Sequence, residues 1–433
     1  MDLSNPPIAD VRARVAALRQ RSTMAAPPDV RAAQTVVLLG SSSRGGSSIF
    51  AEVLRRSPRL LHFRAEINPY LRLHGVDGGV SDAIPADTPI PRGLGFDLGW
   101  DCGHPTDVLV GDDAIWNFAL EIAVRLTLQW PTAELDAEIV HNAVRAVLLE
   151  LQREAGWPVG RFVDAHAFHA RLLTCLRRHW PEIHPGAYDL DRRLLDPDLP
   201  AFSPVTLVEE PPFVLVNPWR GVTDEELATQ PLVIKTPSNA YRLPWLARLF
   251  PKANLRMLHL TRNVAASVNG LYDGWRYPGF HSHYVDVPLQ IEGYTGVVPG
   301  GAHWWKFDRP PGWEAYTQRP LAEVAAFQWR SAHAAILAHA APDTLRLRFE
   351  DVLGSRDRQL AAMLALSQWL RTPVAEELAA VLAGNLPAVM ATEQPRHRRW
   401  FQRIPLLAPL LSDPETLTLM ERLGYGTDPN AWE

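Results

Sequence analysis

The chain of 433 residues has little cysteine and no long apolar run. Its two cysteines, Cys102 and Cys175, cannot form a framework of several disulfides, which is typical of a reducing compartment. No apolar run approaches the roughly 20 residues that a membrane helix needs. The first residues lack the basic and then apolar pattern of a secretory signal. We therefore expect a cytoplasmic protein with no membrane partner.

Lysine is also scarce. It occurs only at positions 235, 252 and 306, so that 40 of the 43 basic residues are arginine. The formal net charge of −5 gives no basic field for nucleic acid, and we expect no nucleic-acid partner. The hydrophobic content of 47% is enough for a large core, in one big domain or two smaller ones.

Short apolar runs alternate with helical patterns along most of the chain. This alternation predicts an α/β fold of three layers, with helices on both faces of a central parallel sheet. Residues 1–33 read as a helical arm and residues 34–433 as one domain. Two insertions interrupt that domain, a helical and loop-rich one at about 75–230 and an aromatic-rich loop at about 275–320. Within the first insertion, residues 114–180 have helical periodicity, whereas 75–113 and 181–230 read as loop.

The segment from Thr35 to Phe50 reads as a strand, a loop of glycine and serine, and a helix. Small residues let backbone N–H groups converge on an anion, and the helix N-terminus adds partial positive charge. The spacing of Gly40 and Gly45 fits the first part of a Walker A loop, but Gly46 stands where its lysine belongs. Arg44 is the fixed cation of this loop. The pattern favours a phosphate or sulfate ligand over the γ-phosphate of ATP.

A second anion signal follows the apolar run at 255–260. Arg262 ends that run, and Ser267 lies five residues on, at the start of the next helix. An arginine fork and a hydroxyl suit a dianionic phosphate. Taken alone, an arginine at a strand end is more often part of a surface ion pair.

In these motifs the chain resembles the sulfotransferases that use 3′-phosphoadenosine 5′-phosphosulfate (PAPS). The resemblance is strongest to the branch that contains tyrosylprotein sulfotransferases and many bacterial enzymes. Five motifs appear in the family's order, with Gly45 replacing the usual first serine and serines replacing the threonines of the first motif. They are Arg44-Gly45-Gly46-Ser47-Ser48, Lys235-Thr236-Pro237, Arg262 with Ser267, Arg348-Phe349-Glu350-Asp351, and Arg399-Trp400 followed by Leu423-Gly424-Tyr425.

The resemblance implies transfer of a sulfuryl group from PAPS to an acceptor hydroxyl, which leaves adenosine 3′,5′-bisphosphate (PAP). It implies that Glu66, just after the second strand, is the general base and that Lys235 neutralises the leaving oxygen with help from Arg44. The expected donor-binding residues are Ser43, Arg44, Gly45, Gly46, Ser47, Ser48, Arg262, Ser267, Arg399 and Trp400. The expected acceptor is a small hydrophobic or aromatic metabolite, as in natural-product biosynthesis.

The residues leave several alternatives open. His104, His281 or His283 could replace Glu66 as the base, and His281 and His283 could contact the acceptor. Three tryptophans could line the acceptor pocket or pack a small core of their own: Trp304, Trp305 and Trp313. A metal at His166 and His169 is disfavoured because no third ligand is near in the sequence. A P-loop kinase or NTPase, or a nucleotide-binding protein without turnover, remains the alternative function. The acceptor and the oligomeric state are left open.

Overall fold

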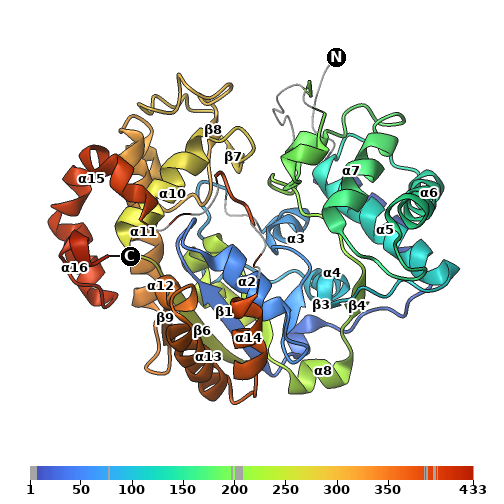
Figure 1. Ribbon diagram of the computed structural model, residues 1–433, viewed down its shortest axis with the longest axis horizontal. Helices are drawn as coiled ribbons and strands as arrows, with labels where there is room; N and C mark the ends of the chain where they lie inside the picture. Colours follow the sequence, from blue (N-terminus) through green and yellow to red (C-terminus); the bar gives the residue numbers. More distant parts are fainter. Residues whose placement is uncertain are drawn as a thin grey trace. The chain divides into compact units, whose positions relative to one another are not determined.

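The computed structural model describes residues 7–76, 79–196, 198–199, 208–384, 386, 389–393, 396 and 398–432. The chain divides into two compact units (Figure 1). Unit 1 comprises Met1–Asp29, Phe63–Val76 and Pro91–Thr223, and unit 2 comprises Val30–His62, Asp77–Ile90 and Asp224–Glu433. The expected division into an arm of residues 1–33 and a single domain stays a prediction.

The main sheet has seven strands in the order β4-β3-β2-β5-β1-β6-β9. They are β1 (Thr35–Gly40), β2 (Leu61–Phe63), β3 (Cys102–Pro105), β4 (Trp219–Gly221), β5 (Leu232–Lys235), β6 (Asn254–Thr261) and β9 (Leu345–Arg348). The pairs β2·β5, β5·β1, β1·β6 and β6·β9 are parallel, and β3·β4 is antiparallel. The predicted α/β class with a mostly parallel central sheet is confirmed.

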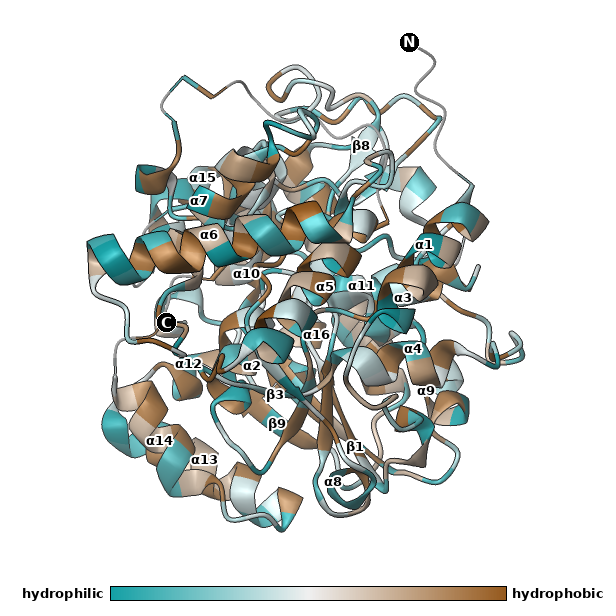
Figure 2. Cartoon of the chain, turned by 90° about the vertical axis from the view of Figure 1, so that its right-hand side faces the viewer, coloured by the Kyte–Doolittle hydropathy of each residue, from teal (hydrophilic) through white to brown (hydrophobic). Residues whose placement is uncertain are grey.

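Helices cover both faces of the parallel strands in unit 2. On one face, Val37 and Leu39 of β1 share a buried cluster with α2 (Ser47–Arg55), α13 (Arg356–Leu370) and α14 (Ala375–Ala383). Successive strand residues point to opposite faces, and Met257 is in register with Leu38. Met257 packs against Ile336 of α11 (Leu321–Ala338), so this helix covers the other face. Figure 2 shows the strands around β1 in hydrophobic colours.

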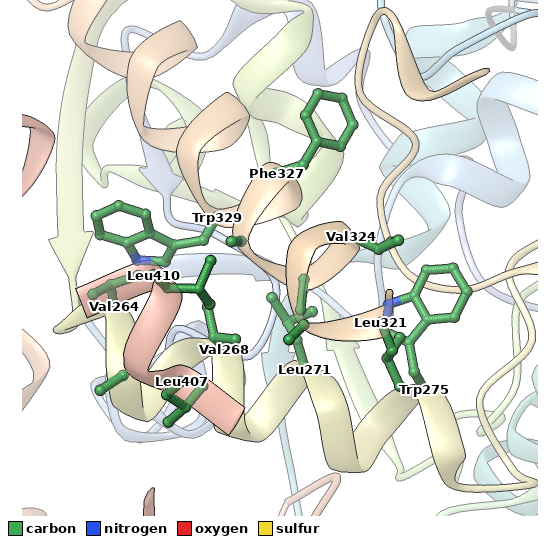
Figure 3. Packing of buried hydrophobic residues seen from close by; sticks show 14 of the residues in the cluster. Val264, Val268, Leu271, Trp275, Leu321, Val324, Phe327, Trp329, Leu407 and Leu410 are labelled. Atoms are coloured by element: carbon green, nitrogen blue, oxygen red, sulfur yellow. The ribbon is translucent and has the colours of Figure 1, made fainter. Parts of the chain in front are cut away.

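A second core of unit 2 forms where α10 (Val264–Arg276) meets α11 (Figure 3). Val264, Val268 and Leu271 recur at helical spacing along α10 and face the α11 side chains. Leu407 and Leu410 of α15 (Ile404–Leu411) join the same cluster. This core fixes the helix that begins directly after β6. The remaining elements of unit 2 are η1 (Val30–Ala32), α8 (Asp224–Thr229), η4 (Pro237–Tyr241), α9 (Leu243–Leu249), β7 (His283–Tyr284), β8 (Trp304–Trp305), η5 (Trp313–Tyr316), α12 (Phe349–Val352), η6 (Arg399–Arg403), α16 (Pro414–Arg422) and η7 (Pro429–Ala431).

Unit 1 is mainly helical. It holds α1 (Ile8–Gln20), α3 (Asn68–Leu73), α4 (Leu94–Asp101), α5 (Asp112–Gln129), α6 (Ala137–Ala155), α7 (Ala165–Leu176), η2 (Pro185–Ala187) and η3 (Arg192–Leu194). Helices α5 to α7 confirm the helical periodicity predicted for residues 114–180. Asp136 caps α6 by accepting from the backbone N–H of Glu138 at 2.8 Å. Figure 2 shows hydrophilic and hydrophobic residues alternating along α6.

The prediction of loop at 75–113 and 181–230 was wrong for short stretches. Those segments contain α4, β3, β4 and α8. Strands β3 and β4, which pair Gly103 with Gly221, have only four and three residues, too few to show a period of two in the sequence. Among the described residues, no helix has the length and apolar character needed to cross a membrane.

Candidate anion-binding site

The loop between β1 and α2 is shaped by two glycines. The backbone N–H of Gly45 donates to the Ser42 carbonyl at 3.0 Å, which closes a turn. A Cβ at Gly45 would lie 2.2 Å from the Ser41 hydroxyl. Gly46 has φ +95°, and its Cβ would lie 2.2 Å from the Phe349 ring. Both positions therefore require glycine, and α2 starts immediately after them at the end where backbone N–H groups are available.

Lys235 lies at the end of β5, beside the end of β1. Its backbone is in register with Leu39, and its ammonium group donates to the Ser48 hydroxyl at 3.0 Å. Because the carboxyl ends of parallel strands meet at one edge of a sheet, the lysine predicted from sequence reaches the first turn of α2. The structure thus brings Lys235 and Ser48 together.

The second anion signal reaches the same loop from β6. The Arg262 guanidinium donates to the Arg44 carbonyl at 3.2 Å and lies over the Phe349 ring, 4.9 Å from its centroid. Burial lowers the pKa of Arg262, although the nearby Glu350 carboxylate acts in the opposite direction. The hydroxyl of Ser267 is fully buried and has no hydrogen-bond partner among the residues that the structure describes.

Two of the sequence motifs hold the start of α10 in place. The Asn263 side chain caps the helix by accepting from the Ala266 N–H at 2.8 Å. Glu350 accepts from the Asn263 backbone N–H at 2.9 Å and from its side-chain amide at 2.8 Å. The Tyr425 hydroxyl donates to the other Glu350 oxygen at 2.8 Å. The motifs at 348–351 and 423–425 therefore hold the start of α10, between Arg262 and Ser267, in position.

The side chain of Arg44 is anchored to backbone carbonyls. It donates to Gly270 at 3.2 Å and to Met390 at 2.5 Å, and its guanidinium lies 5.4 Å from the centre of the Phe280 ring. The residue has φ +60°, a left-handed conformation that is uncommon for a side chain other than glycine. The Arg44 carbonyl therefore faces Arg262, while the Arg44 guanidinium reaches α10.

Arg399 and Trp400 occupy η6, at the far end of α10. Arg399 forms an ion pair with Asp273, which Arg403 also contacts at 2.5 Å. Trp400 is buried in the core cluster of α10 and α15. Their expected contact with the donor stays a prediction.

Glu66 belongs to unit 1, in the connection between β2 and α3, and it is partly exposed. Its neighbour Arg64 is buried, 3.4 Å from Glu121 and 4.0 Å from Asp101. The strand before Glu66 pairs with β5, with Leu61 in register with Leu232. The catalytic role of Glu66 stays a prediction.

The histidines fall into different environments. The ring of His283 lies 3.3 Å from the Asp82 carboxylate. His281 is buried, and burial together with the charge of Lys306 lowers its pKa to about 3. His104 is buried on β3. His283, one of the three candidates for the alternative base, therefore lies beside a carboxylate.

The two histidines of α7 serve the local fold. His169 is buried against the Val216 carbonyl at 2.8 Å, and burial lowers its pKa to about 4. His166 accepts from the Asp191 N–H at 3.2 Å. Within the described part of the chain, no three His, Cys, Asp or Glu side chains gather where they could hold a metal ion.

The three tryptophans are packed into unit 2. Trp305 has its ring centre 5.1 Å from those of Trp275 and Trp313, and Trp304 lies 5.4 Å from His281. All three indoles are buried. The aromatic run therefore builds a core, and its contact with an acceptor stays a prediction.

Sequence reasoning missed a carboxylate beside the loop. Asp308 is buried and accepts from the hydroxyls of Ser43 and Tyr241, the latter at 2.6 Å. It stands in a stretch without periodicity, and no motif marks it. Another buried carboxylate, Asp82, is the neighbour of Asp308 and accepts from Ser238 at 2.6 Å.

Compared with known proteins, the chain matches no protein-family model and no curated protein. Two solved structures are similar to it. The sulfotransferase domain from the curacin biosynthetic pathway has 11% identity and a TM-score of 0.37, with 90% of this chain and 98% of that chain covered. The sulfotransferase STF9 from Mycobacterium avium has 13% identity and a TM-score of 0.33, with 93% and 83% covered. Both are sulfotransferases, and because both TM-scores lie below 0.5 we argue the function from the site residues themselves.

Proposed function

We propose that this protein is an O-sulfotransferase that takes a sulfuryl group from PAPS. The observation that carries the proposal is that three elements meet at one edge of the sheet, where the parallel strands end. The loop after β1, Lys235 of β5 and Arg262 of β6 are joined by hydrogen bonds to Ser48 and to the Arg44 carbonyl. Such a cradle has positions for two separate anionic groups, and PAPS carries two.

The residues present fit the donor. The buried Ser267 hydroxyl is an orphaned polar atom, which is costly unless a ligand or water satisfies it. The lowered pKa of Arg262 means that burial disfavours its charge, which an anion would offset. We assign Arg262 and Ser267 to the 3′-phosphate and the loop from Ser43 to Ser48 to the phosphosulfate. Arg399 and Trp400 are proposed as further donor contacts.

PAPS supplies the sulfuryl group when it is bound. Catalysis of such transfers consists mostly of positioning and charge stabilisation, by analogy with phosphoryl transfer. Lys235 neutralises the oxygen that departs with the phosphate, assisted by Arg44. Glu66 removes the proton of the acceptor hydroxyl, a role that rests on the family resemblance. His283 is the rival base because Asp82 orients its ring.

The alternatives are a P-loop kinase or NTPase and a nucleotide-binding protein without turnover. The loop of an ATP-binding protein of this type places a lysine where Gly46 stands. The Phe349 ring fills the space in which a side chain at residue 46 would begin, which disfavours that class. The joint presence of Glu66 and Lys235 disfavours a protein without turnover. A small hydrophobic or aromatic hydroxyl compound in the cytoplasm remains the proposed acceptor.

The first test compares ligands by thermal unfolding. PAP at a hundred times its dissociation constant should stabilise the protein by about 2.7 kcal/mol, whereas ATP with Mg²⁺ should act much more weakly. Equal shifts with both ligands would contradict the proposal. Labelled PAPS offered to a panel of hydroxyl compounds then tests transfer, with Lys235→Met as the impaired variant and the exposed Lys252→Met as its matched control.

A further inference from the structure

Asp308 connects the anion-binding loop to two other parts of unit 2. One carboxylate oxygen accepts from the hydroxyl of Ser43 in the loop, and the other accepts from Tyr241 of η4 at 2.6 Å. The Asp308 side chain is 2% exposed. A carboxylate with both oxygens engaged by hydroxyls cannot rotate without breaking one of these bonds.

The backbone of Asp308 is held as firmly. Its carbonyl accepts from the Trp305 indole at 2.9 Å and from the Gln328 amide at 2.7 Å. The preceding residue, Phe307, has φ +62° and donates its N–H to the Ser282 hydroxyl at 3.0 Å. A non-glycine residue in this conformation persists only where its surroundings enforce it. The structure therefore fixes Asp308 in one position against Ser43.

When it is ionised, the Asp308 carboxylate adds a negative charge near the anion-binding loop, beside that of Asp82. Asp82 faces it and stays ionised, because His283, Arg242 and Ser238 hold the pKa of Asp82 below its usual value in spite of burial. Burial raises the pKa of Asp308 to about 6, with the Asp82 charge adding to the effect and the Ser43 and Tyr241 bonds opposing it. Tyr241 keeps its proton because burial and Asp308 raise its pKa well above the usual range.

The direction of the Ser43 hydroxyl depends on the protonation of Asp308. An ionised carboxylate only accepts, so the Ser43 hydroxyl donates its hydrogen bond to Asp308 and its lone pairs face the loop. A protonated carboxyl can donate to the Ser43 oxygen, which frees the Ser43 proton for an anion in the loop. A bound anion also disfavours a second negative charge one hydrogen bond away.

We propose that Asp308 is a positioning residue of the donor loop, which aims the Ser43 hydroxyl and takes up one proton from solvent when the donor anion binds. This inference rests on the proposed function, because the donor supplies the anion. It predicts that PAP binds more weakly as the pH rises through the neutral range, by up to about tenfold per pH unit, the limit for one linked proton.

The experiment measures PAP binding by calorimetry from about pH 5 to pH 8.5, in buffers of different ionisation enthalpy. The wild-type protein should take up close to one proton per PAP near neutral pH beyond the uptake of Asp308→Asn. That variant keeps the size of the side chain but cannot titrate, so it retains only the titration of the ligand's phosphates and of the other protein groups. At the upper end of the range it should bind PAP more tightly than the wild type does.

A second variant separates this role from simple packing. Tyr241→Phe removes one hydrogen bond to the ionised carboxylate, so it should move the midpoint of the pH dependence upward. A purely structural role of Asp308 predicts weaker binding at every pH and no shift of the midpoint. If Asp308→Asn does not fold, the midpoint of the pH dependence of PAP binding in Tyr241→Phe decides whether the inference holds.

Three outcomes are distinguishable. PAP binding with equal pH profiles and equal proton uptake in wild type and Asp308→Asn overturns this inference and leaves the proposed function intact. An unmoved midpoint in Tyr241→Phe also overturns the inference. Absence of PAP binding at any pH overturns the proposed function and this inference with it.

Discussion

Two arginines, the buried Arg125 of unit 1 and the half-buried Arg262 of unit 2, have surroundings that shift their pKa in opposite directions. In unit 1, Arg125 donates to Glu209 at 3.0 Å and to Asp101, and these two carboxylates raise its pKa well above the usual value in spite of burial. In unit 2, Arg262 donates to the Arg44 carbonyl at 3.2 Å, and burial lowers its pKa. An arginine side chain is thus stabilised in its charged form by its surroundings in unit 1 and destabilised in that form in unit 2.

The difference separates a structural charge from one that suits a ligand. Arg125 contacts the carboxylates of Asp101 and Glu209, and Asp101 also faces Arg64. The charge of Arg125 is therefore compensated within the fold. The Arg262 guanidinium donates to a neutral carbonyl, and the nearby Glu350 carboxylate offsets only part of its desolvation, which a bound phosphate would offset further. A half-buried cation whose pKa is lowered at the carboxyl edge of a parallel sheet is therefore a sharper indicator of an anion site than the count of basic residues.

The largest expected effect is on the stability of unit 1. Arg125→Ala leaves Asp101 and Glu209 buried without their shared partner, and it should lower the free energy of unfolding by about 3–5 kcal/mol. Urea denaturation measures this loss. The matched control is Arg161→Ala, which breaks an exposed pair with Asp107 and should cost at most about 1 kcal/mol. Equal losses in the two variants would show that the buried ion pairs of Arg125 stabilise unit 1 no more than an exposed pair does.

The next effect is on donor binding. Arg262→Ala should weaken PAP binding by about 2–5 kcal/mol, because the 3′-phosphate loses a half-buried charged partner. Turnover at saturating PAPS should change much less, since that phosphate is remote from the transferred group. Calorimetry with PAP measures the change, and Arg248→Ala on α9, whose partners are exposed backbone carbonyls, is the control. Unchanged affinity in Arg262→Ala would show that the phosphate is held elsewhere.

Glu66 tests whether unit 1 contributes to chemistry as well as to stability. Glu66→Gln keeps the size of the side chain but cannot accept a proton, so turnover should fall roughly 10²-fold or more with PAP binding intact. The assay uses labelled PAPS and an accepted hydroxyl compound. His283→Ala is measured beside it, because Asp82 orients that ring. Near-normal turnover in Glu66→Gln with loss in His283→Ala would transfer the role of base to the histidine.

The sequence predicts well those features that depend on local chemistry. The loop glycines, the lysine at the end of β5 and the arginine at the end of β6 each follow a buried apolar run, and parallel strands bring such ends to one edge. The family resemblance also singled out the motif at Glu350. It did not show that Glu350 caps α10 together with Tyr425, because that contact joins residues 75 positions apart.

Features that depend on long-range packing escaped prediction. Asp308 reaches Ser43 across 265 positions of chain, from a segment with no periodicity. The tryptophans at 304, 305 and 313 fitted a pocket wall or a core equally well on composition. In the structure Trp305 packs against Trp313, and Trp304 packs against His281. Strands β3 and β4 lie in segments for which the sequence predicts loop, because three or four residues carry too little pattern to indicate a strand.

The smallest expected effect concerns a third cation, which has neither the carboxylate partners of Arg125 nor a place in the proposed anion site. Lys306 is fully buried in unit 2, where it donates to the Tyr277 carbonyl and lies 5.5 Å from the centre of the Tyr294 ring. Burial lowers its pKa from 10.5 to about 7. The folded protein therefore binds fewer protons than the unfolded chain between these two values. The lysine destabilises the fold fully below about pH 7, and this cost disappears as the pH rises toward 10.5.

Lys306→Met fills the same space without a charge, so it should raise the free energy of unfolding by about 1–2 kcal/mol near pH 6. The gain is smaller than the full desolvation cost because the bond to the Tyr277 carbonyl is lost as well. Near pH 10 the gain should vanish or reverse, since the folded wild type then buries a neutral amine that keeps its hydrogen bond. Urea denaturation at both pH values measures this, with the exposed Lys252→Met as control. A gain that persists unchanged at high pH would mean that packing, rather than the buried charge, separates the two side chains.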